Sequence, residues 1–136
     1  MSATDTSQIL LADAWVEGDA SARWRSATGH GPDDGASASG SSLLEVEPGC
    51  RLPAHTDSAE ETIVVTGGTA AVRIGNDEHE VPEGGIALVP ADVRHEVRNA
   101  GAEPLRFVAV YAGTDVTTTY ETEVQPDGAR ERKPLG

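Results

Sequence analysis

The fold is constrained most by a succession of short runs rich in Val, Ile and Thr, which begins at Ser42 and is cut by turn residues. Short β-branched runs that end at Gly, Pro, Asn or Asp are typical of strands, because those residues favour chain reversals. The pattern predicts an all-β chain folded as an antiparallel sandwich or barrel. The expected strands are Ser42–Glu47, Glu61–Thr66, Thr69–Ile74, Glu78–Val81, Gly85–Val89, His95–Asn99 and Leu105–Tyr111.

The segments on either side of this region carry weaker signals. Gln8–Ala12 and Ala22–Ser26 are strand candidates, whereas Gly29–Ser41 is so polar and rich in Gly and Ser that we expect a mobile loop, or alternatively a lid. Thr117–Val124 is a further strand candidate, followed by a loose end. We expect N-terminal strands and a flexible loop over residues 1–41, a barrel core over residues 42–112, and a C-terminal strand and tail over residues 113–136.

Several smaller features have local interpretations. Gly67-Gly68, with apolar runs on both sides, predicts a two-residue hairpin. Asn99 is expected to stabilise a turn, and Phe107 and Tyr111 share one strand face and are expected to fill the core. The triplet Arg23–Arg25 is interpreted as part of an edge strand, the alternative being that an arginine or the indole lies at the barrel mouth.

Charge and cysteine content exclude several classes of partner. The chain has 23 Asp and Glu against 10 Lys and Arg, a formal charge of −13, which repels phosphate backbones and anionic lipid headgroups. No nucleic-acid or membrane partner is expected. The single cysteine, Cys50, allows no disulfide within the chain, and no signal sequence is evident, so we expect a cytoplasmic protein. Exposed strand edges favour a homodimer.

Two histidines and one or two carboxylates fall where strand geometry directs their side chains to the same side. His55 and Asp57 are two residues apart, so in an extended segment they share a face. Glu61 opens the next strand on the same face as Ile63 and Val65, and a carboxylate directed into an apolar interior needs a cationic partner.

His95 shows the same inward direction. It alternates with Arg94, Glu96 and Arg98, which form the wet face of its strand. His55, Asp57, Glu61 and His95 therefore predict a site for Fe(II), Mn(II) or Zn(II), with positions left open for water or substrate. His30 and His79 lack such companions and are not expected to be ligands.

These two segments resemble the paired motifs of the cupin superfamily. The first motif is matched by Gly49, His55, Glu61 and Gly68, and the second by Gly84, Pro90, His95 and Asn99. The resemblance implies a single jelly-roll barrel, or double-stranded β-helix, with a metal near its centre. Asp92 replaces the turn glycine of the second motif, and Asp57 replaces the second histidine of the first.

Asp57 allows three interpretations. As a fourth ligand it would balance a divalent charge and shift the preference toward Fe(II) or Mn(II) rather than Zn(II) or Ni(II). As a free carboxylate beside a three-ligand metal it would be a catalytic general base. The third interpretation is a barrel that has lost its metal. His55, Asp57 and His95 also mimic the facial triad of oxygenases that consume 2-oxoglutarate, with Arg106 as the clamp for the oxoacid.

The resemblance implies a metal-dependent enzyme that acts on a small organic molecule. Dioxygenase chemistry suits an Fe(II) site, whereas isomerase, lyase or cyclase chemistry suits Mn(II), Zn(II) or Ni(II). The alternative is a non-catalytic cupin that binds a small ligand.

Overall fold

The computed structural model describes residues 3–136 and is built almost entirely of strands, with short 3₁₀ helices at Thr6–Gln8 and Pro32–Asp34. No helix among these residues has the length and apolar character needed to cross a membrane. The strands are β1 (Ala12–Val16), β2 (Asp19–His30), β3 (Gly40–Val46), β4 (Arg51–Asp57), β5 (Glu61–Gly67), β6 (Thr69–Ile74), β7 (Asp77–Pro82), β8 (Ile86–Val89), β9 (His95–Asn99), β10 (Leu105–Tyr111), β11 (Thr118–Val124) and β12 (Ala129–Arg132).

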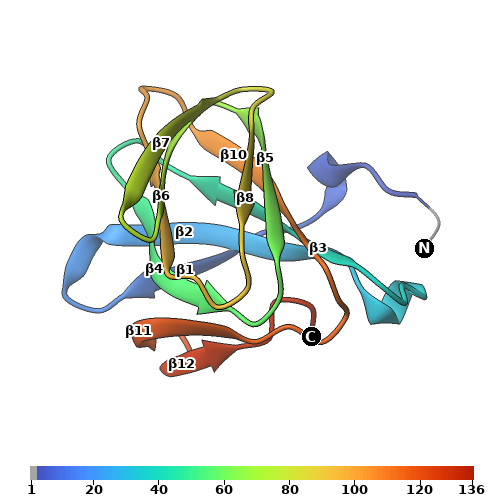
Figure 1. Cartoon of the computed structure of the whole chain (residues 1–136). Helices are drawn as coiled ribbons and strands as arrows, with labels where there is room; N and C mark the ends of the chain where they lie inside the picture. The colour runs from blue at the N-terminus through green and yellow to red at the C-terminus, as the bar shows by residue number, and fades with distance from the viewer. Residues whose placement is uncertain (1–2) are drawn as a thin grey trace.

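The strands wrap around one interior as two facing sheets (Figure 1). One sheet has the order β1-β2-β3-β10-β5-β8, and the other joins β7, β6, β9 and β4 to β11 and β12. Every pairing is antiparallel except a parallel contact between β2 and β4, where Ala22 lies opposite Arg51. The all-β barrel predicted from the turn-punctuated sequence is confirmed.

The core lies between the two sheets because inward and outward residues alternate along the strands. In β5, β9 and β10 every second residue is buried, and Ile63, Val97 and Phe107 are among those with almost no exposed surface. Burying an aliphatic or aromatic side chain of this size stabilises a fold by about 1.5–3 kcal/mol. Any polar or charged side chain in this apolar interior needs a hydrogen-bond or ionic partner inside the barrel.

Most predicted strands have the expected bounds, and β6, β9 and β10 match them residue for residue. The N-terminal candidate Gln8–Ala12 is wrong, because β1 begins only at Ala12 and Leu10 is exposed. The expected loose end contains β12, which pairs with β11. Three of its four residues are charged, so neither hydrophobicity nor alternation marks them as a strand.

The predicted hairpin at Gly67-Gly68 is also wrong. β5 pairs with β8 and β10, whereas β6 pairs with β7 and β9, so the two glycines carry the chain from one sheet to the other. Gly68 has a φ of +75°, and a Cβ there would lie 2.7 Å from the carbonyl oxygen of Pro104. The glycine is therefore required by a close backbone approach at the sheet crossing.

The segment Gly29–Ser41 is not the open loop expected from its composition. β2 continues to His30, β3 begins at Gly40, and the turn of Pro32–Asp34 lies between them. The His30 ring contacts the hydroxyls of Ser41 (2.7 Å) and Ser39 (3.0 Å), so polar side chains are satisfied within the segment. A Cβ on Gly29 would lie 2.5 Å from the Ser41 Oγ, so the glycine allows the close approach of β2 to β3 here.

The strand around Arg23–Arg25 is not an edge strand. β2 pairs with β1 on one side and with β3 on the other. Trp24 is buried, whereas Arg25 faces outward and forms ion pairs with Glu45 and Glu47. The indole, rather than an arginine, therefore faces the barrel interior.

Candidate metal site

A β-bulge in β4 sets the direction of His55. In the pairing of β4 with β9, Leu52 lies opposite Val97 and His55 lies opposite His95, so β4 holds one extra residue between these pairs. Leu52 and His55 are three residues apart but both are buried, which simple alternation would forbid. Pro53 lies within the bulge, where a missing N–H costs no ladder hydrogen bond.

Both imidazoles are oriented in the same way by the backbone. The His55 Nδ1 donates to the carbonyl of Pro53 (2.7 Å), and the His95 Nδ1 donates to the carbonyl of Val93 (2.9 Å). Because a carbonyl can only accept a hydrogen bond, each Nδ1 must carry a proton. In a neutral ring the Nε2 then has a free lone pair, which can bind a metal ion. Both Nε2 atoms point into the barrel.

Four donor groups converge on one point inside the barrel. His55 and Asp57 come from β4, Glu61 from the start of β5 and His95 from the start of β9. All four side chains are buried, and one ligand atom from each lies within 4.8 Å of the other three. The His95 Nε2 lies 2.9 Å from Glu61 Oε1 and 3.2 Å from Asp57 Oδ2. The sequence prediction that these four residues share a face is consistent with this arrangement.

The two oxygens of Asp57 have different environments. Oδ1 accepts a hydrogen bond of 2.5 Å from the Thr118 hydroxyl on β11, which lies opposite Asp57 in register. Oδ2 is buried and accepts no well-directed hydrogen bond, although it lies 3.2 Å from the His95 Nε2 and 3.6 Å from the His55 Nε2. A buried carboxylate oxygen without a well-directed hydrogen bond lowers the stability of the fold, and a bound ion is one explanation for such an atom. Oδ2 is directed at the point where the other donors converge.

Burial and mutual charge strongly perturb the ionisation of the cluster in the metal-free protein. Burial lowers the pKa of His55 to about 4. Burial also opposes protonation of His95, but the adjacent carboxylates of Asp57 and Glu61 outweigh it and raise the pKa of His95 to about 10. Burial raises the pKa of Glu61. Two carboxylates therefore share the proton of one imidazole, an arrangement that a cation would replace.

The donor set fits a divalent metal ion. Two neutral imidazoles and two carboxylates supply four donors whose charge balances +2, and the unpaired Asp57 Oδ2 would gain a partner. His55, Asp57, Glu61 and His95 would hold such an ion.

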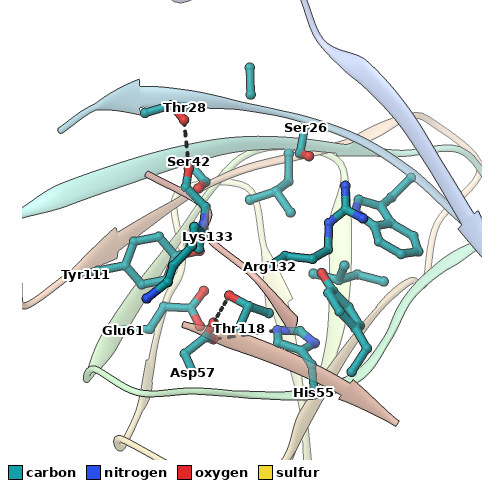
Figure 2. A pocket seen from close by; sticks show the side chains of 16 residues that line it. Ser26, Thr28, Ser42, His55, Asp57, Glu61, Tyr111, Thr118, Arg132 and Lys133 are labelled. Atoms are coloured by element: carbon teal, nitrogen blue, oxygen red, sulfur yellow. Dashed lines mark hydrogen bonds and ion pairs between the residues drawn. The ribbon is translucent and has the colours of Figure 1, made fainter. Parts of the chain in front are cut away.

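A cavity of about 190 Å³ opens onto the cluster. Figure 2 shows His55, Asp57 and Glu61 on one side of this cavity and Ser42 and Thr28 on the other. Below the roughly 300–1,000 Å³ of drug-sized pockets, this volume suits a small molecule. The wall is rich in hydroxyls, which come from Ser26, Thr28, Ser42, Tyr111, Thr118 and Tyr120.

Aromatic side chains complete the wall. Trp24 stacks on Tyr120 at 5.5 Å between ring centroids, and Tyr120 lies 5.1 Å from His55. Tyr111 lies opposite Glu61 in the pairing of β10 with β5. Burial and the neighbouring carboxylates raise the pKa of both tyrosines, so each phenol remains a hydrogen-bond donor at neutral pH.

The predictions for residues outside the cluster agree with the structure in some cases and not in others. Arg106 does not face the site, because it is exposed and forms an ion pair with Glu45, so the clamp of the 2-oxoglutarate hypothesis is wrong. His79 is exposed on β7. Asn99 stabilises its turn as expected, since its amide donates to Val46 and Glu103.

Few signals in the sequence indicate that the C-terminal strands contribute residues to this site. Thr118 and Tyr120 alternate correctly in a candidate strand, but nothing local indicates that this strand pairs with β4. The sequence predicts a loose end after Val124, but two residues of this segment, Arg132 and Lys133, line the cavity.

A family model described as the cupin domain matches residues 42–111. Because this match covers just over half of the chain, the protein belongs to the cupin family. The mannose-1-phosphate guanylyltransferase of Salmonella muenchen is 32% identical over 73 residues, which are 52% of this chain and only 15% of that protein.

Solved structures share the fold at low sequence identity. The oxalate decarboxylase of Lactobacillus farciminis, in a formate complex, has a TM-score of 0.62 at 21% identity over 67% of this chain and 29% of that chain. The Cnp3 cupin domain of Schizosaccharomyces pombe has a TM-score of 0.67 at 13% identity, over 82% of this chain and 74% of that one. At these identities the likeness concerns the fold alone.

Replacing Thr118 by valine should weaken metal binding. The substitution keeps the shape of the side chain but removes the hydrogen bond that fixes Asp57. Loss of such an outer partner lowers metal affinity by about 10–100-fold. Calorimetric titration with Mn(II) checks this, with Thr119→Val on the opposite face of β11 as the control. Equal affinities for the two variants would contradict the positioning role.

Metal affinity should rise with pH. Because the pKa of His95 is about 10 in the metal-free protein, its Nε2 must lose a proton before it can bind a metal at neutral pH. The release of at least this proton predicts an association constant that rises about tenfold or more per pH unit near neutrality, because Glu61, whose pKa is raised to about 7, can release a second. Titrations with Mn(II) in buffers of different ionisation enthalpy count the released protons. An affinity that does not change between about pH 6 and pH 8 would contradict this linkage.

Proposed function

We propose that this cupin is a metal-dependent enzyme that acts on a small organic molecule. The observation that carries the proposal is the convergence of four buried donor groups at the edge of a small, hydroxyl-lined cavity. A fold shared with an oxalate decarboxylase is compatible with enzymatic chemistry in such a cavity. His55, Asp57, Glu61 and His95 form the ligand set.

Asp57 is proposed as the fourth ligand rather than as a free base. Its Oδ1 is already satisfied by Thr118, and its Oδ2 lies among the donor atoms of the cluster. With two carboxylates in the set, Fe(II) and Mn(II) are favoured over Zn(II) and Ni(II), because carboxylate ligands suit the harder ions. A bound ion of this kind supplies Lewis-acid polarisation of substrate oxygens or activation of O₂.

The chain's own residues would position the substrate. The protonated hydroxyl of Tyr111, next to Glu61, can donate a hydrogen bond to a substrate oxygen. Trp24 and Tyr120 form an aromatic wall that limits the entry of water. Dioxygenase chemistry and isomerase, lyase or cyclase chemistry are both compatible with this arrangement.

A non-catalytic binding function is the second candidate, and one observation favours it. Among the described residues that line the cavity, the carboxylates and imidazoles all belong to the donor cluster. With Asp57 and Glu61 used as ligands, no separate carboxylate base faces the cavity. Turnover therefore separates the two functions.

Elemental analysis and turnover assays test the enzyme proposal. We expect one equivalent of Fe(II) or Mn(II) per chain, and His95→Gln should lower metal affinity by more than the about 100-fold upper range seen for outer-shell changes. His79→Gln on the exposed face of β7 is the control. Oxygen uptake or product formation with small acids, phenols and sugars should require the metal.

Two results would reject this function. A protein that binds no metal and is indifferent to substitution of His55, Glu61 and His95 would exclude a metal site. A protein that binds metal and small molecules but converts none of them would be a binding module.

We also propose that two copies of the chain associate through β8, by way of its free edge and its exposed apolar side chains. This strand ends its sheet, so its free edge can pair with the same strand of a second copy. Ile86 and Leu88 are 67% and 56% exposed there, and Ile86 lies beside Val64 of β5.

Light scattering on purified protein tests the homodimer. Replacing both Ile86 and Leu88 by lysine should convert a dimer into a monomer, because it places charges at an apolar contact. Leu10→Lys is the matched control, since Leu10 is 92% exposed and lies outside β8, in the segment before β1. A wild-type protein that stays monomeric at all concentrations would exclude the dimer.

A further inference from the structure

Two cationic side chains line the cavity that opens onto the donor cluster. They are Arg132, the last residue of β12, and Lys133, which follows it. Figure 2 shows both between the donor residues and the wall that carries Thr28 and Ser42. In a chain with a formal charge of −13 and only 10 Lys and Arg, two cations on one small cavity are a notable concentration of positive charge.

The backbone after β12 is held firmly against the barrel, which fixes the position of these cations. Thr28 donates a hydrogen bond of 2.7 Å to the carbonyl of Pro134. Leu135 is buried against Gly40, where a Cβ would lie 2.7 Å from the Leu135 Cδ2. Gly40 therefore leaves room for the leucine, and residues 134 and 135 are anchored on the neighbouring strands β2 and β3.

The charge of the site leaves these cations available to a ligand. A divalent ion held by Asp57 and Glu61 is neutral in total, so it does not require Arg132 or Lys133 as counterions. Arg132 is paired with Asp127, and Lys133 with Asp115 and Thr117. The side chains of Asp127 and Asp115 are 59% and 88% exposed, and exposed pairs of this kind contribute little and exchange readily.

We propose that the ligand of this site is a small carboxylate, whose carboxylate group is bound by Arg132 and Lys133. This inference rests on the proposed function, because the other end of the same molecule would face the metal. Charge-assisted hydrogen bonds from a guanidinium and an ammonium are the strongest available to a carboxylate. The cavity volume of about 190 Å³ limits the ligand to a few heavy atoms, and the wall hydroxyls suit its remaining oxygens.

Calorimetry on the Mn(II)-loaded protein tests the proposal with matched probes. Acetate and malonate are compared with acetamide and malonamide, which have the same shape without the charge. We expect the affinity for the carboxylates to be higher than that for the amides by about tenfold or more. Arg132→Gln and Lys133→Gln, singly and together, should remove this preference without weakening Mn(II) binding, because neither residue is a proposed ligand. Arg73→Gln on the outer face of β6 is the control for net charge.

The outcomes separate this inference from the proposed function. Amides that bind as tightly as the carboxylates, or a double variant that keeps the wild-type preference, would overturn the inference even if the metal binds. If Mn(II) does not bind, the proposed function fails, and the same titrations are then made on the metal-free protein. A carboxylate preference that depends on Arg132 and Lys133 would still support the anion site, and its absence would overturn it.

Discussion

The structure depends on one electrostatic constraint, which is that two carboxylates are buried inside an apolar barrel. Asp57 and Glu61 have almost no exposed surface, and an isolated buried carboxylate costs several kcal/mol of effective desolvation. In the metal-free protein a single protonated imidazole, His95, serves both of them. A divalent cation at this point would give the two Nε2 atoms, the Asp57 Oδ2 and the Glu61 carboxylate a common partner.

Alternation along the strands made part of this site predictable. His95 and Glu61 lie on strands with regular inward and outward residues, so their direction followed from their neighbours. The pairing of His55 with Asp57 was predicted from the same rule, and it holds because the bulge at Pro53 lies just before His55. The bulge itself had no signal beyond the proline, since the register of β4 depends on its partner β9.

Long-range pairing explains what could not be predicted. The two glycines at 67 and 68 look like a hairpin, but the partners of β5 and β6 are set by strands far along the chain. The same holds for Thr118, Arg132 and Lys133, whose roles follow from where β11 and β12 dock. A charged strand such as β12 carries no hydrophobic pattern, so its place in the sheet is decided by its partner.

The pairing of β11 with β4 brings residues from the C-terminal end of the chain to the cavity wall. All four metal-binding candidates lie in the part of the chain that the cupin model matches, whereas Thr118, Tyr120, Arg132 and Lys133 lie beyond it. The candidate donor set and the C-terminal part of the cavity wall are thus separate stretches of sequence, while Ser42 and Tyr111 of the matched region and Thr28 of β2 complete the wall. Ligand preference in such a barrel can diverge through exchange of the C-terminal hairpin alone, while the donor set stays as it is.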